Sequence, residues 1–84
     1  MNETEKKKLL YRANYRGFKE ADILLGGFLK ENIDKLSDVE LRQFEDLLEA
    51  KDHDIYAWIT GAMDVPANYD TPILEKIREY RPQF

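Results

Sequence analysis

The clearest structural signal in the chain is residues 37–49, which read "SDVELRQFEDLLE". Ser37 followed three residues later by Glu40 forms a capping box, in which each side chain can bind the other residue's backbone amide. Apolar residues then recur every three or four positions and predict one buried face; they are Leu41, Phe44, Leu47 and Leu48. The pattern predicts an amphipathic helix that begins at Asp38.

The same spacing recurs on both sides of this helix. It predicts five short helices, at about residues 3–13, from 18 to about 30, from 38 onward, from 52 to about 60, and from about 72 to 81. Strict alternation of apolar and polar residues is absent, so we expect an all-α fold, a compact bundle of five short helices. Gly26 and Gly27 fall inside the second helix and indicate either close helix contact or a weakened turn.

Polar and special residues mark where the last two helices begin and end. Asp52 is expected to cap the start of the fourth helix, and Gly61 to end it. Either Asp70 or Thr71 is expected to cap the fifth helix, with Pro72 in its first turn, where a missing N–H costs little. Pro82 is expected to end that helix.

Composition limits the kinds of protein that the chain can be. With 84 residues and no cysteine, we expect one domain over residues 1–84, with an ordered core at about 3–81 that is stabilised by packing alone. The net charge of −4 disfavours nucleic acid as a partner. No apolar run approaches a membrane span, and the N-terminus lacks a targeting segment, so we expect a reducing, soluble compartment.

Candidate catalytic residues are few. His53 is the only histidine and lies between Asp52 and Asp54, where a solvated helix start is a better interpretation than a metal site. Ser37 is the only serine, and its capping role explains it. The sequence therefore favours a non-catalytic protein that acts through its surface.

Residues 15–20 read "YRGFKE" and allow two interpretations. In the first, Gly17 is the N-cap of the second helix, and Glu20 folds back on its amide. In the second, the helix begins early, so that Arg16 and Glu20 lie one turn apart and flank a flat glycine that a partner can approach. Physical reasoning alone does not choose between capping and docking.

Three segments resemble the small succinate dehydrogenase assembly factors, the flavinylation factors of bacteria and mitochondria. They are "RGFKEAD" at 16–22, which fits an R-G-x-x-E signature followed by Asp, "LSDVELRQFEDLLE" at 36–49, and "DHDIYAWITG" at 52–61. The resemblance covers roughly residues 8–80 in matching order. His53 stands where many relatives have Pro, and Phe18 where Met is common.

This resemblance implies a five-helix bundle and a function. Members help FAD become covalently attached to the flavoprotein subunit of succinate dehydrogenase, and sometimes of fumarate reductase. Their R-G-x-x-E surface meets the flavoprotein, which points to a partner-binding site with four members: Arg16, Gly17, Glu20 and Asp22. Tyr56 and Trp58 also match family positions, but for Trp58 we expect a place in the core.

Two other functions remain open. One is an FAD-binding flavin transferase that acts directly on the flavoprotein, and the other is a generic acidic helical adaptor for protein–protein interaction. We expect an assembly chaperone that binds no cofactor stably, because FAD is handled on the partner flavoprotein. We also expect a monomer in the bacterial cytoplasm, without membrane insertion.

Overall fold

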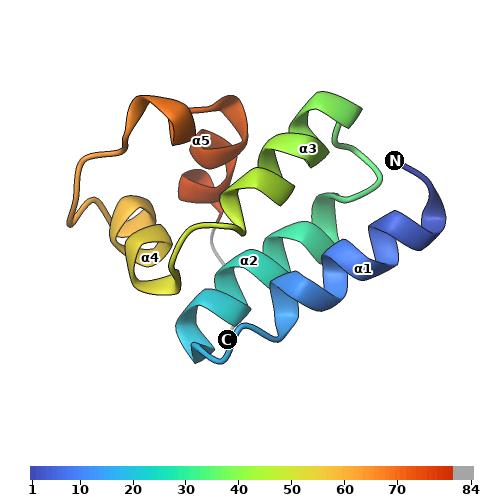
Figure 1. The fold of residues 1–84 in the computed structure, drawn as a ribbon, viewed down its shortest axis with the longest axis horizontal. Helices are drawn as coiled ribbons and strands as arrows, with labels where there is room; N and C mark the ends of the chain where they lie inside the picture. The colour runs from blue at the N-terminus through green and yellow to red at the C-terminus, as the bar shows by residue number, and fades with distance from the viewer. Residues whose placement is uncertain (81–84) are drawn as a thin grey trace.

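All five expected helices are present in the computed structural model of the chain, which describes residues 1–80. They are α1 (Glu3–Asn14), α2 (Lys19–Asn32), α3 (Asp38–Leu47), α4 (Asp52–Thr60) and α5 (Pro72–Glu79), with a 3-10 turn at Ala67–Tyr69. α1 and α2 lie side by side as an antiparallel pair, while α4 and α5 close the opposite end of the molecule (Figure 1). Every regular element of the described residues is helical, which confirms the all-α fold.

Local sequence signals determine where α3 begins and where α4 ends. Ser37 Oγ accepts the Glu40 amide at 3.2 Å, and Glu40 Oε1 accepts the Ser37 amide at 3.1 Å, so the capping box is confirmed. Gly61 ends α4 with a φ of 84°, a left-handed conformation that other residues rarely adopt. Both ends were predictable because each depends on residues within one helical turn.

The start of α5 resolves an open choice. Thr71, rather than Asp70, is its N-cap, and the Thr71 hydroxyl accepts the amide of the third helical residue. Pro72 occupies the first helical position, as expected. The helix ends at Glu79, and the expected stop at Pro82 lies outside the described residues.

The expected cap of α4 is wrong. Lys51 occupies the N-cap position, without a side-chain hydrogen bond to the helix, and Asp52 is the first helical residue. The Asp52 carboxylate binds the guanidinium of Arg16, so it does not cap its own helix. Asp52 therefore makes a charged contact with a distant segment in place of the expected local cap.

The two glycines within α2 mark close contacts. A Cβ at Gly26 would lie 2.2 Å from Oδ1 of Asn14, at the end of α1. A Cβ at Gly27 would lie 2.8 Å from the hydroxyl oxygen of Tyr80, just after α5. Close approach of neighbouring segments, and not a weakened turn, therefore explains both residues.

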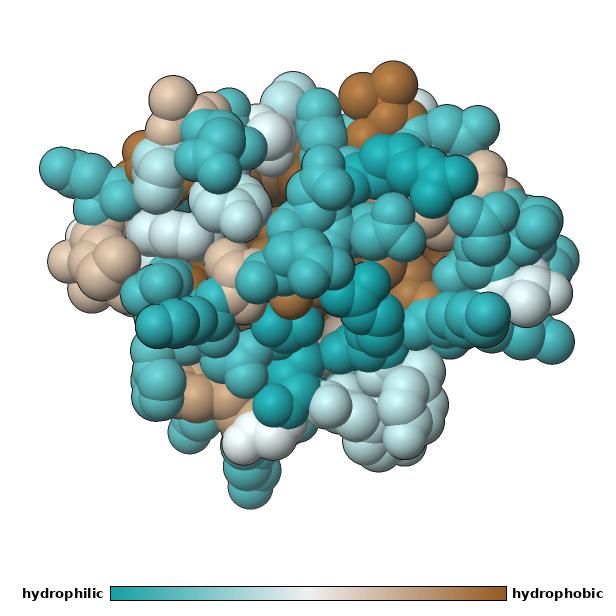
Figure 2. Space-filling model, viewed as in Figure 1, coloured by the Kyte–Doolittle hydropathy of each residue, from teal (hydrophilic) through white to brown (hydrophobic). Residues whose placement is uncertain are grey.

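One apolar core joins all five helices. Its largest fully buried residue is Phe44 on α3, whose ring lies 6.2 Å from that of Phe28 on α2. Trp58 is 4% exposed and stacks on Tyr69, with ring centroids 5.0 Å apart, which confirms its expected place in the core. The outer surface is mostly hydrophilic on the face in Figure 2, where apolar patches are small and separate. Among the described helices, none combines the length and apolar character needed to cross a membrane.

Candidate docking site at the loop between the first two helices

Gly17 is required by the path of the loop between α1 and α2. Its φ is +84°, in the left-handed region where an L side chain is strained. The residue is exposed, and an added Cβ would meet no atom within 4 Å. Phe18, not Gly17, is the N-cap residue of α2, so the capping interpretation of Gly17 is wrong.

Asp22 closes this loop from the first turn of α2. Its carboxylate accepts the backbone N–H of Arg16 at 2.9 Å. The amide of Asp22 in turn donates to the carbonyl of Phe18 at 2.9 Å, the first backbone bond of the helix. An acidic residue in a first helical turn is a recognisable sequence signal, but its bond six residues back was not predicted.

Arg16 binds inward, to the connection between α3 and α4. One guanidinium nitrogen donates to the carbonyls of Leu48 at 2.8 Å and Ala50 at 3.0 Å, while Nε binds the carboxylate of Asp52. Leu48 is the C-cap of α3, and a carbonyl at the end of a helix lacks an intrahelical donor and carries the negative end of the helix dipole, which makes it a good acceptor for a cation. Only 13% of the Arg16 side chain is exposed.

The structure therefore divides the four expected partner-binding residues into two pairs. Because α2 begins at Lys19, Arg16 and Glu20 do not lie one turn apart on a helix, and that geometric expectation is wrong. Arg16 and Asp22 hold the loop, whereas Gly17 and Glu20 are exposed on it. Within residues 1–80 the Glu20 side chain has neither a hydrogen bond nor an ion pair. Contact of these residues with a partner stays a prediction.

An aromatic cluster supports the loop from the side of α4. The Phe18 ring is half-buried and lies 4.7 Å from the ring of His53, edge to face, and 5.4 Å from that of Tyr56. His53 itself is exposed, in agreement with a solvated helix start. The described residues contain no group of three or more His, Cys, Asp or Glu side chains placed to hold a metal ion.

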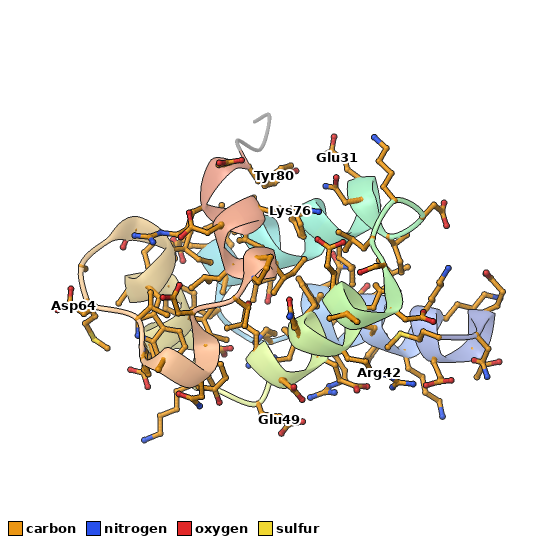
Figure 3. All side chains as sticks on the ribbon, turned by 90° about the horizontal axis from the view of Figure 1, so that it is seen from above. Glu31, Arg42, Glu49, Asp64, Lys76 and Tyr80 are labelled. Carbon is orange, nitrogen blue, oxygen red and sulfur yellow. The ribbon has the colours of Figure 1, made fainter. Side chains whose placement is uncertain are left out.

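A second aromatic pair lies beside the loop on α1. The rings of Tyr11 and Tyr15 are 4.6 Å apart and are 66% and 70% exposed. An open hollow of about 320 Å³ lies beside them, lined also by Arg12, Arg16 and Asp52. Arg12 donates to Glu49 at 2.9 Å; Figure 3 shows Glu49 near the end of α3, turned toward the outside.

These features define a small helical protein whose polar loop is fixed by internal bonds and offers a glycine and a carboxylate at the surface. The chain belongs to the family described as "Flavinator of succinate dehydrogenase", whose model matches residues 7–81. This confirms the resemblance found in the three sequence segments.

Curated relatives agree with this membership. The chain is 40% identical over 82 residues to "Succinate dehydrogenase assembly factor 2, mitochondrial" of Dictyostelium discoideum, covering 95% of this chain and 58% of the relative. It is 38% identical over 74 residues to "FAD assembly factor SdhE" of Acetobacter pasteurianus, covering 88% of this chain and 68% of the relative. A Meyerozyma guilliermondii assembly factor 2 is 44% identical over 63 residues, covering 75% and 47%. The chain thus spans about half to two thirds of these relatives, and no solved structure matches it significantly.

Proposed function

We propose that this chain binds the flavoprotein subunit of succinate dehydrogenase and promotes the covalent attachment of FAD to it. The observation that carries the proposal is the match of residues 7–81 to a family of flavinators of succinate dehydrogenase. The geometry is compatible with docking, because Gly17 and Glu20 are exposed on a loop that Arg16 and Asp22 hold in place. In this proposal FAD is a substrate on the flavoprotein and not a cofactor of this chain.

The proposed role is that of a non-catalytic assembly factor. A fixed docking loop can favour one arrangement of a flexible partner over another, because a ligand shifts a conformational equilibrium by its difference in affinity for the two states. A tenfold enrichment of the competent arrangement needs a difference of about 1.4 kcal/mol, which a few contacts can supply. The reacting groups then belong to the flavoprotein, and this chain leaves after attachment.

Two glycines provide a matched test of docking. Gly17 and Gly61 both have a φ of +84° and no atom within 4 Å of an added Cβ. Gly17→Arg and Gly61→Arg should therefore lose similar stability, about 1–2 kcal/mol from backbone strain. In co-expression with the flavoprotein subunit, covalent flavin read by in-gel fluorescence should be lost with Gly17→Arg and retained with Gly61→Arg.

The outcome of this pair separates docking from stability. If both variants lose flavinylation to the same extent, the loss follows from backbone strain and gives no support to docking. If Gly17→Arg folds and promotes flavinylation fully, the docking site is refuted. Glu20→Lys adds a variant without strain, because its side chain is exposed and makes no polar contact in the described residues. It should cost about 1 kcal/mol or less, because it places a cation in the first turn of α2, and it should reduce covalent flavin.

Four finer parts of the proposal have their own measurements. Stoichiometric binding of FAD by the pure chain, followed by flavin fluorescence, would favour a flavin transferase over the non-catalytic role. Co-expression with the flavoprotein of fumarate reductase tests that second client. Light scattering tests the proposed monomer, and fractionation of bacterial cells tests the proposed cytoplasmic location.

A further inference from the structure

Positive charge is concentrated in one short part of the chain. Residues 6–19 contain six of the 13 Lys and Arg residues and none of the 17 Asp and Glu residues, although the whole chain has a net charge of −4. These residues form most of α1, the following loop and the first residue of α2. The protein therefore has a basic edge on an otherwise acidic molecule.

Internal contacts use only part of this charge. Arg12 pairs with Glu49, and Arg16 pairs with Asp52. A second set of cations is exposed and has no ion pair or side-chain hydrogen bond within residues 1–80; its members are Lys7, Lys8 and Lys19. Their charges are available to another molecule.

Two exposed aromatic rings lie near Lys7 and Lys8. Lys7 and Lys8 precede Tyr11 by four and three residues, so their side chains share one side of α1 with its ring. Tyr11 and Tyr15, whose rings are tilted by 35° to each other, are 66% and 70% exposed, and neither belongs to the apolar core. We call Lys7, Lys8, Tyr11 and Tyr15 the basic aromatic face. Exposed tyrosine rings are enriched at protein interfaces.

We propose that the basic aromatic face binds a short acidic segment of the flavoprotein, with carboxylates at the lysines and an apolar side chain on the two rings. This inference rests on the proposed function and extends its docking site along α1, because Tyr15 lies two residues before Gly17. The charge of the face is complementary to such a segment, and opposite charges across an interface speed and orient association.

The size of the face favours a segment over an extended polyanion. Lys7 lies on α1 and Tyr15 is its C-cap, eight residues later, which gives about 12 Å at 1.5 Å per residue and matches about four residues of extended chain. Acidic side chains border the face at both ends, with Glu3 and Glu5 before it and Glu20 after it. A nucleic acid or an anionic bilayer would meet these carboxylates, whereas a short peptide segment fits between them.

The test is a titration of the full chain with purified flavoprotein subunit that lacks covalent flavin. Lys7→Glu/Lys8→Glu should raise the Kd about tenfold at about 50 mM salt and remove most of its rise toward about 300 mM salt. Lys30→Glu/Lys35→Glu is the matched control, because it makes the same charge change at exposed lysines on and after the far end of α2. The control should change the Kd by less than about threefold.

The aromatic half of the face is tested separately. Tyr11→Ser/Tyr15→Ser should also raise the Kd about tenfold, with little change in melting temperature, because both rings are largely exposed. If the two lysine pairs weaken binding equally, the effect comes from net charge, and the inference is overturned. It is also overturned if both α1 variants bind normally while vesicles containing phosphatidylserine bind the wild-type chain through Lys7 and Lys8.

The same titration distinguishes this inference from the proposed function. If the α1 variants bind normally and Gly17→Arg does not, docking at the loop stands and the basic aromatic face is rejected. If the wild-type chain does not bind the flavoprotein, both are rejected. If the α1 variants and Gly17→Arg each weaken binding while the Lys30→Glu/Lys35→Glu control does not, both are supported.

Discussion

Replacing Arg16 with Met should show how strongly the loop is tied to the rest of the fold. The substitution keeps most of the apolar stem but removes three polar contacts, to two carbonyls and one carboxylate. It leaves Asp52, whose side chain is only 22% exposed, without its cation. Removing one partner of a buried ion pair costs about 3–5 kcal/mol of unfolding free energy. Because the Arg16 and Asp52 side chains are partly exposed, we expect a loss at the lower end, about 3 kcal/mol.

Thermal and urea unfolding, followed by circular dichroism, measure this effect. A loss of about 3 kcal/mol should lower the melting temperature by roughly 12–24 °C in a domain of this size. Asp52→Asn keeps an oxygen that accepts from Arg16, so it should cost only about 1 kcal/mol. In a double-mutant cycle, Arg16→Met and Asp52→Ala should show a coupling energy of about 1–2 kcal/mol.

Arg42→Met is the matched control for the same change of residue type. Arg42 pairs with Glu5 and Glu45, but its side chain is 53% exposed, so its loss should cost about 0.5 kcal/mol or less. If Arg16→Met costs no more than Arg42→Met, the inward contacts of Arg16 do not stabilise the fold. The loop would then lack the internal support that the proposed docking site requires.

Three further predictions concern the core and its edges. Gly26→Ala should lower the unfolding free energy by about 1–3 kcal/mol, although alanine has the better helix propensity, because the new Cβ meets the Asn14 side chain. Asn14→Ala in the same chain should restore much of this free energy, which the midpoints of denaturant unfolding measure. Phe44→Ala should lower the unfolding free energy by about 3–5 kcal/mol, which is most of the stability of so small a domain. A denaturant midpoint near that of the wild type would refute the central place of Phe44 in the core. Burial and a hydrogen bond to Glu31 raise the pKa of Tyr80 to about 12, from 10.0. The stability from this phenol is therefore complete below pH 10 and lost as the pH rises toward 12, and Tyr80→Phe should remove that part of the pH dependence.

The contact behind the Tyr80 prediction joins two segments that are far apart in the sequence (Figure 3). Tyr80 and Glu31 lie next to each other there, although one follows α5 and the other is on α2. The Tyr80 ring also packs edge to face on Phe28, with centroids 5.9 Å apart. A pH effect that persisted unchanged in Tyr80→Phe would assign it to another group.

The sequence predicted those parts of the fold that depend on neighbouring residues. The capping box of Ser37 and Glu40 and the stop at Gly61 are each set within one turn of chain, whereas the sequence left the cap of α5 open between Asp70 and Thr71. Apolar spacing likewise identified the buried side of α3, because residues that recur every three or four positions lie on one face of a helix. Family membership came from resemblance, since no spacing argument leads to flavin attachment.

The candidate site could be predicted only in part, because its bonds are not local. Arg16 and Asp52 are 36 residues apart, and nothing in the sequence tells whether an arginine beside a glycine binds outward or inward. The sign of φ at Gly17 depends on the path that the chain takes between two packed helices. A capping role for Asp52 is the expectation from its neighbours, because its actual partner, Arg16, belongs to a distant segment.

The inward contacts of Arg16 make two separate connections of the fold into one cooperative unit. The guanidinium joins the segment between α1 and α2 to the segment between α3 and α4, so neither can open without losing the same bonds. Amide hydrogens on both segments should consequently exchange through a shared opening event. A partner that immobilises the first segment also slows the opening of the second, although it need not contact it.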